Sequence, residues 1–187
     1  TGATNTGDAS GETVLERDVP ADVEGLLREA AARFIGPSLQ VPPMYSAVQQ
    51  GGRRMYELAR EGITVERKPR PITIYDLRVL GFEGRHVRMR VACSEGTYVR
   101  TLCEDLGAAI GSAAHLAALL REASGPFVVY ESLTLEEIAA APDQALTSPE
   151  RVIPFPTIVL DGRNTADFRA GRMVPLPTGA TSKHVFV

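Results

Sequence analysis

The chain has 187 residues, 44% of them hydrophobic and 23% charged, and a formal net charge of −3. This composition fits one globular domain, or one domain with a small appendage, and the net charge does not by itself indicate nucleic-acid binding. No apolar run is long enough to span a membrane, and no Cys-x-x-Cys pair or Cys/His cluster predicts a zinc site. The two cysteines, Cys93 and Cys103, form no disulfide framework, which favours a reducing cytoplasm.

The hydrophobic periodicity and the turn residues predict an alternation of strands and helices. In chain order, they predict a strand at 12–17, a helix at 22–34, an irregular segment at 41–47, a helix at 53–60, strands at 72–82 and 86–91, helices at 97–110 and 112–121, a strand at 128–130, a helix at 135–141 and a strand at 158–160. Asp22 is a suitable N-cap for the first long helix, and Thr134 with Glu137 has the pattern of a capping box. Two prolines exclude a regular helix around Tyr45, which is therefore expected on a rigid, non-helical segment.

The two strands at 72–82 and 86–91 are expected to form a hairpin around Glu83-Gly84. Apolar and polar residues alternate along the second strand, which gives it an apolar face and a basic face. The apolar face carries Val87, Met89 and Val91, and the other face carries His86, Arg88 and Arg90.

Basic residues are concentrated between Arg53 and Arg90. This stretch holds ten of the 20 Lys and Arg residues against five acids, and nine of the ten are arginine. Such a cluster favours contact with a phosphate backbone, whereas a solvated surface with local ion pairs is the alternative that the sequence leaves open. The candidate backbone contacts are Arg53, Arg54, Arg67, Lys68, Arg70, Arg88 and Arg90.

The most informative stretch is 93–102 (CSEGTYVRTL), where a strand pattern gives way to a helical one. A Gly-Thr turn there would place Tyr98 and Arg100, two residues apart, at the junction of a sheet and a helix. A planar phenol and a permanent cation together suit a flat, uncharged base on an anionic backbone. A core tyrosine beside a surface arginine is the alternative interpretation of this local pattern.

Five sequence blocks follow one another in a fixed order. They are QVPPMYSAV at 40–48, GRRMYELAREG at 52–62, RPITIY at 70–75, CSEGTYVR at 93–100, and HL with SGPF at 115–116 and 124–127. In this order and spacing, the chain resembles the TruB family of tRNA pseudouridine synthases from Thr4 to Phe127. Residues 4–11 (TNTGDASG) resemble the family's Thr-x-Thr-x-Asp-x-x-Gly turn, and the resemblance is much weaker past Ser148.

The resemblance implies an α/β (α+β) fold, with a mixed, mainly antiparallel sheet flanked by helices. We expect residues 1–147 to be the C-terminal portion of a pseudouridine synthase catalytic domain. Residues 148–187 would begin a truncated, PUA-like, β-rich RNA-binding appendage, and 183–187 read as the start of a strand. Truncation at both ends is therefore expected.

The resemblance also implies a reaction. Members of the family convert a T-loop uridine of tRNA, at position 55, to pseudouridine without cofactor or metal, after flipping the base into a pocket. Their essential aspartate lies in a Gly-Gly-Thr-Leu-Asp-Pro motif upstream of the Thr-x-Thr turn, and no aspartate of this chain has that context. We therefore expect an inactive fragment of a monomeric, cytoplasmic enzyme that binds the tRNA T-arm, with no metal and no membrane contact.

The alternative is a non-catalytic RNA-binding module or tRNA-folding helper that has kept the basic face and the base pocket without the nucleophile. The two hypotheses differ in whether the parent reading frame continues upstream into a Gly-Thr-Leu-Asp motif.

The resemblance implies roles for individual residues. Tyr98 matches the active-site tyrosine that lies against the target base, and Arg100 matches the arginine that pairs with the catalytic aspartate. Leu119 matches a leucine that packs on the flipped base, and Tyr45 is expected to support the floor of the pocket. The family often has Leu-Arg-Arg-Thr where this chain has LLRE at 119–122, so one basic residue is lost and an acid is gained, while Arg121 remains as a substrate contact.

Overall fold

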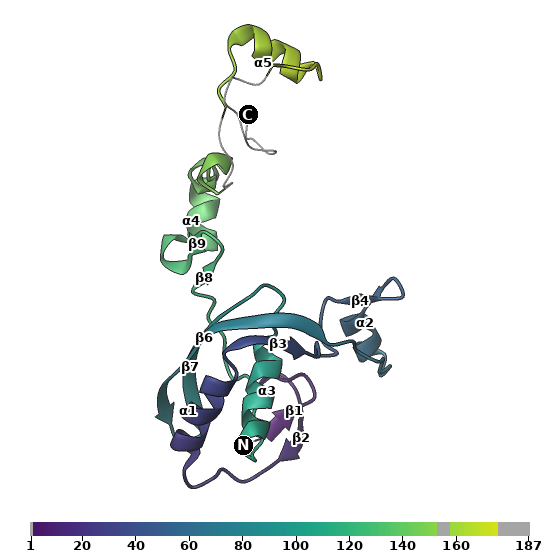
Figure 1. Cartoon of the computed structure of the whole chain (residues 1–187), viewed down its shortest axis with the longest axis vertical. Coiled ribbons are helices and arrows are strands. Elements are labelled where there is room, and N and C mark those ends of the chain that lie inside the picture. Colours follow the sequence, from purple (N-terminus) through teal and green to yellow (C-terminus); the bar gives the residue numbers. More distant parts are fainter. Residues whose placement is uncertain (1, 153–157, 176–187) are drawn as a thin grey trace. The chain divides into compact units, whose positions relative to one another are not determined.

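The computed structural model of the chain describes residues 2–152 and 158–175 (Figure 1). Its strands are β1 (Gly2–Thr4), β2 (Thr13–Glu16), β3 (Gly36–Gln40), β4 (Gln49–Gln50), β5 (Arg53–Arg54), β6 (Arg70–Glu83), β7 (His86–Cys93), β8 (Ala123–Ser124) and β9 (Phe127–Val128). Its helices are α1 (Val23–Arg33), α2 (Met55–Arg60), α3 (Val99–Ala109), α4 (Leu135–Ala140) and α5 (Gly162–Arg169), with 3₁₀ turns η1 (Val129–Glu131), η2 (Pro142–Ala145) and η3 (Pro149–Arg151). The predicted strand start at 183–187 lies outside the described residues. The chain divides into two compact units, Thr1–Leu119 and Leu120–Val187.

An antiparallel sheet in the order β3-β6-β7 supports the first unit. Helices α1 and α3 pack side by side and form one hydrophobic core with this sheet (Figure 1). The core residues are Leu27, Ala30, Ala31, Ile72, Ile74, Leu77, Leu102 and Leu106. The predicted fold class, a mixed α/β protein with mainly antiparallel pairing, is confirmed.

The predicted hairpin is confirmed, since β6 and β7 pair across the Glu83-Gly84 turn with Glu83 opposite His86. The two faces of β7 differ as expected: its apolar residues pack against the core, whereas Arg88 and Arg90 are exposed. The hairpin therefore carries its cations on the side that faces away from the core.

Two helices begin at the capping residues that the sequence predicts. The Asp22 carboxylate accepts a hydrogen bond from the Gly25 N–H at 3.1 Å, at the start of α1. At the start of α4, the Thr134 hydroxyl accepts from the Glu137 N–H at 3.2 Å and the Glu137 carboxylate accepts from the Thr134 N–H at 2.7 Å. Both caps satisfy main-chain donors that the helix itself leaves unpaired.

The predicted helix at 112–121 is wrong, because this segment pairs with the N-terminal turn. Leu116 donates its N–H to the Gly7 carbonyl at 3.0 Å, and its own carbonyl accepts the Ala9 N–H at 3.0 Å. His115 Nδ1 lies 2.7 Å from the carbonyl oxygen of Gly2, 113 positions away in the chain, and donates to it. These long-range bonds use the main-chain groups that a helix would need for itself.

Three further differences concern short strands. The strand β3 was not predicted, because Gly36 with φ +115° and Pro37 obscure its pattern, and it is defined by pairing with β6 from Gly36 opposite Ile74 to Gln40 opposite Arg70. The predicted strand at 158–160 is wrong, since these residues are irregular and α5 follows them. The predicted strand at 128–130 is also shorter than expected, because β9 ends at Val128 and η1 follows. No helix in the described part of the chain has the length and apolar character needed to cross a membrane.

Candidate active site

The sheet-to-helix junction after β7 is the structural centre of the candidate site. Gly96 adopts φ +80°, which a glycine tolerates without strain, and turns the chain after the strand. Tyr98 then forms the N-cap of α3 in an extended conformation, and Arg100 lies in the first turn of the helix. The predicted placement of Tyr98 and Arg100 where a sheet meets a helix is therefore observed.

Arg100 connects three segments that are distant in the sequence. Its Nη1 donates to the Thr6 carbonyl at 3.0 Å and to Asp8 Oδ2 at 3.3 Å, while its Nη2 donates to the Tyr45 carbonyl at 2.6 Å. The side chains of Arg100 and Asp8 are only 23% and 29% exposed. Because this ion pair is partly buried, water and salt screen its charges less than those of a surface pair. The planar fork of the guanidinium also lets it reach two carbonyl groups at once.

The Asp8 carboxylate is held by the turn in which it lies. Its Oδ1 accepts hydrogen bonds from the Ser10 hydroxyl at 2.6 Å, the Thr6 hydroxyl at 2.8 Å and the Ser10 N–H at 3.1 Å. The Ser10 hydroxyl is the main cause of a lowered pKa for Asp8, with further contributions from Thr6 and from the charge of Arg100 that outweigh the opposing effect of desolvation. The carboxylate is thus a fixed anion that orients Arg100.

A glycine lets this turn approach helix α3. Gly7 has φ +76°, and a Cβ there would lie 3.0 Å from Glu104 Oε1 and 3.3 Å from Arg100 Cβ. A side chain at this position would strain the backbone and crowd the helix. Burial raises the pKa of Glu104, as does neighbouring Asp105, against the opposing charges of Arg100 and Arg67. The turn and the first half of α3 therefore form one tightly packed charged cluster.

The Tyr45 segment is irregular, as its prolines predict, and is held by main-chain contacts. Arg67 donates through Nη1 to the Pro42 carbonyl at 3.1 Å, and the Tyr56 N–H donates to the Ser46 carbonyl at 3.1 Å. The contact between Tyr45 and Arg100 is made by the Tyr45 carbonyl, not by its ring. Sequence reasoning identified the residue, but only the structure shows that its main chain is what Arg100 uses.

Leu119 and Arg121, the two remaining predicted substrate contacts, belong to different units. Leu119 ends the first unit and is 58% exposed, and Arg121 belongs to the second unit and is also exposed. An exposed leucine of this size is available for contact with a planar ligand.

The residues predicted to contact the RNA backbone differ in the contacts that they make within the protein. Arg53 forms an ion pair with Glu61, Arg88 forms one with Glu83 at 3.0 Å, and Arg54 lies over the ring of Tyr56. Arg67 is half-buried and holds the Tyr45 segment, so its main contact in this structure is to the protein itself. Lys68, Arg70 and Arg90 are exposed. Both interpretations of the basic stretch, a phosphate-binding face and a solvated face with ion pairs, therefore have residues that fit them.

Sequence reasoning missed the roles of two residues. Asp8 was not among the predicted site residues, although its place in the Thr-x-Thr-x-Asp turn was a signal that it belongs near the site. Gln40 gave no signal beyond its place at the start of a motif block. It is 5% exposed, and its side-chain amide is bonded to the main chain of Tyr98.

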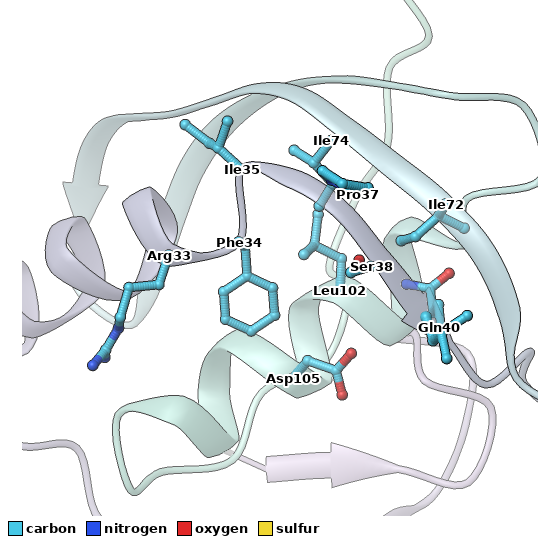
Figure 2. Close-up of a pocket in the computed structure, with 11 residues that line it drawn as sticks. Arg33, Phe34, Ile35, Pro37, Ser38, Gln40, Ile72, Ile74, Leu102 and Asp105 are labelled. Carbon is cyan, nitrogen blue, oxygen red and sulfur yellow. The ribbon is translucent and has the colours of Figure 1, made fainter.

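A cavity of about 240 Å³ lies between β3, β6 and the helices (Figure 2). It is lined by Arg33, Phe34, Ile35, Pro37, Ser38, Leu39, Gln40, Ile72, Ile74, Leu102 and Asp105. None of the predicted base-contacting residues lines it, so it is distinct from the Arg100 cluster. Burial raises the pKa of Asp105, the acidic group in this lining.

Within residues 2–152 and 158–175, no group of three or more His, Cys, Asp and Glu side chains is arranged to hold a metal ion. Burial raises the pKa of the Cys103 thiol to about 11, so this thiol stays protonated near neutral pH and is a poor nucleophile.

The amino-acid sequence is similar to those of known proteins. The N-terminal domain model of the TruB family pseudouridylate synthases matches residues 1–99, and the C-terminal domain model of tRNA pseudouridylate synthase B matches residues 100–153. A tRNA pseudouridine synthase B of Azoarcus sp. is 43% identical over 179 residues, which are 93% of this chain and 59% of that protein. Proteins of the same name from Pseudomonas putida and Symbiobacterium thermophilum are 50% and 46% identical, over 74% and 88% of this chain and 45% and 56% of theirs.

The chain thus spans between 45% and 59% of the length of these three relatives. Among solved structures, a chain of the crystal structure of a Cbf5-Nop10-Gar1 complex superposes with a TM-score of 0.59 at 27% identity, over 83% of this chain and 46% of that one.

Proposed function

The chain belongs to the TruB family of pseudouridylate synthases, and we propose that the whole protein is a tRNA pseudouridine synthase that acts on a T-loop uridine at position 55. The reaction is an isomerisation: the bond between C1′ and N1 of the uracil breaks, a bond between C1′ and C5 forms, and a proton passes from C5 to N1. Atoms and electrons balance without an oxidant, a reductant or a cofactor. We further propose that no metal takes part.

The observation that carries this proposal is the anchored guanidinium of Arg100. Three of its five N–H donors are bonded, to Thr6, Asp8 and Tyr45. Within the described residues, two donors remain for a second carboxylate. An arginine held in this way keeps a facing aspartate ionised and aimed, as a nucleophile at C1′ requires.

Tyr98 begins the same helix, two residues before Arg100, and is half-buried. We propose that its ring lies against the target base and that its hydroxyl assists the transfer of the proton. Leu119 would add an apolar wall on the other side of the flipped base, Tyr45 would support the pocket floor, and Arg121 would contact the substrate.

The exposed cations are proposed to bind the backbone of the tRNA T-arm. Arg88 and Arg90 protrude from the face of β7 opposite the core, and Lys68 and Arg70 lead into β6. Three of these cations would have to exchange their present partners for phosphates: Arg53 its pairing with Glu61, Arg54 with Tyr56, and Arg88 with Glu83. In this proposal, residues 1–147 belong to the catalytic domain, residues 148–187 begin an RNA-binding appendage, and the enzyme works as a cytoplasmic monomer.

The test compares the 187-residue chain with an extended protein, defined as the same chain preceded by its parent reading frame through a Gly-Thr-Leu-Asp segment. The extended protein should form pseudouridine at position 55 of a tRNA transcript in the presence of a chelator. The 187-residue chain should form none, because it carries no aspartate in the nucleophile motif. Turnover by the 187-residue chain in a single-turnover assay would refute this assignment of the nucleophile.

A further inference from the structure

The side chain of Gln40 forms two hydrogen bonds with a single residue of the candidate site. Its Oε1 accepts the N–H of Tyr98 at 2.8 Å, and its Nε2 donates to the carbonyl of Tyr98 at 3.1 Å. The orientation of the amide follows from chemistry, because an N–H must meet an oxygen and a carbonyl must meet an NH₂ group. The two residues are 58 positions apart, so this pairing is purely tertiary.

These two bonds fix the main chain of Tyr98 on both sides of its Cα. The N–H of an N-cap residue has no partner inside the helix, and here Gln40 supplies it. The Tyr98 carbonyl already accepts the N–H of Leu102 at 3.1 Å, and Gln40 adds a second donor to it. Rotation about φ or ψ of Tyr98 would break at least one of these bonds, so the extended geometry at this residue is strongly constrained.

The location of Gln40 adds to this constraint. It is 5% exposed and ends β3, where it lies opposite Arg70 in the β3–β6 register. A buried amide that loses a partner leaves polar groups unsatisfied, which is costly inside a protein. A glutamine is the right length and has both a donor and an acceptor, whereas a carboxylate could only accept.

We propose that Gln40 is a positioning residue of the reaction, which sets the direction in which Tyr98 and, two residues later, Arg100 enter the active site. It acts through the main chain and touches neither the base nor the ribose. This inference rests on the proposed function, because the positioned groups are those assigned to proton transfer and to orienting the nucleophile. An error of about 1 Å in such groups slows a reaction by up to roughly 10²-fold.

The test uses two substitutions at this position and one control. Gln40→Met keeps the size but removes both hydrogen bonds at every pH. Gln40→Glu removes only the donor when the carboxyl is ionised, and regains it when the carboxyl is protonated. Gln49→Glu, at an exposed position in β4, introduces the same charge without a comparable contact.

The pH dependence of Gln40→Glu provides a signature that a general loss of stability would not produce. Desolvation should raise the pKa of a buried glutamate at this position above its ordinary value. Its protonated form should restore the geometry at acid pH, and the defect should grow as the pH rises through that pKa. Among the charged groups near this position, Asp105 on α3 and Arg33 at the end of α1 line the same cavity as Gln40, and Arg70 on β6 lies opposite it in the sheet register. All three are present in the wild type as well. Rates are therefore expressed relative to wild type at each pH.

Two measurements decide the proposal. The first is hydrogen exchange of the Tyr98 amide in the 187-residue chain, which should quicken by about tenfold in Gln40→Met, because the acceptor of this N–H is lost, and stay near the wild-type value in Gln40→Glu, which keeps an acceptor at every pH. The second is the single-turnover rate of the extended protein, which should fall by roughly 10-fold to 10²-fold while its affinity for tRNA stays within about twofold. Gln49→Glu should behave as wild type in both measurements.

Unchanged exchange at Tyr98 in Gln40→Met would overturn the proposal, as would a relative rate of Gln40→Glu that does not vary with pH. A rate loss matched by an equal loss of tRNA affinity would also overturn it. If Gln40→Met does not fold, Gln40→Glu compared at acid and neutral pH decides the matter alone. An inactive extended wild-type protein would refute the proposed function, whereas the exchange of the Tyr98 amide independently decides whether Gln40 holds this residue.

Discussion

Replacing Arg100 with lysine in the extended protein should separate catalysis from binding. The guanidinium reaches the Thr6 carbonyl through Nη1 and the Tyr45 carbonyl through Nη2, at 3.0 and 2.6 Å. A lysine ammonium is a single point of charge on a flexible stem, so it cannot occupy both nitrogen positions at once. At least one charge-assisted hydrogen bond is therefore lost, and the remaining charge is less well aimed.

The magnitude follows from these contacts. A hydrogen bond to a charged group contributes roughly 1.5–3 kcal/mol, and removing a positioned electrostatic partner of a transition state typically costs about 10²-fold in rate. We expect Arg100→Lys to slow the chemical step by roughly 10²-fold or more, since the remaining charge is less well aimed at the nucleophile. The affinity for tRNA should change little, because the side chain is 23% exposed and is already engaged within the protein.

The assay combines single-turnover formation of pseudouridine, at saturating enzyme, with a separate measurement of the dissociation constant for the same tRNA. Arg28→Lys is the matched control, because Arg28 is an exposed arginine on α1 that forms an ion pair with Glu24 at 2.7 Å. If Arg100→Lys weakens tRNA binding by the same factor as it slows the rate, Arg100 is a backbone contact and the catalytic assignment is wrong. A rate equal to that of the control would contradict it equally.

Three further predictions concern the Tyr98 hydroxyl, the exposed arginines of β7 and the Asp8 carboxylate. Tyr98→Phe should bind tRNA as wild type but react slowly, since the ring remains and only the hydroxyl is lost; an unchanged single-turnover rate would remove the hydroxyl from the mechanism. Replacing Arg88 and Arg90 with glutamate should weaken T-arm binding and flatten its dependence on salt, and an unaltered salt slope would instead support a merely solvated face. Asp8→Asn should lower the free energy of unfolding at neutral pH by roughly 1–2 kcal/mol. Because the folded pKa of Asp8 is lowered, the stabilisation is complete above the ordinary pKa of 3.8 and is lost as the pH falls through the folded value. The difference between wild type and Asp8→Asn in denaturant titrations should therefore close in acid, and a pH-independent difference would show that the charge of Asp8 is not what stabilises the turn.

The sequence alone determined the features that depend on neighbouring residues. Caps at Asp22 and Thr134, the two-faced strand β7 and the irregular segment around Tyr45 are each specified within a few positions, because capping, alternation and proline geometry are local effects. The ordered blocks also identified the family and placed Tyr98 and Arg100 at a sheet-to-helix junction. For these features, the local preference and the tertiary fold agree.

Only the tertiary structure decided which main-chain and side-chain groups meet across long separations. The apolar pattern at 112–121 favours a helix, yet Leu116 pairs with the N-terminal turn instead. Likewise, the partners of Arg100 lie up to 94 positions away, and Gln40 reaches Tyr98 across 58 positions. A hydrogen bond between distant residues leaves no periodic trace in the sequence, because its geometry depends on how the intervening sheet and helices pack and not on the spacing of the two residues along the chain.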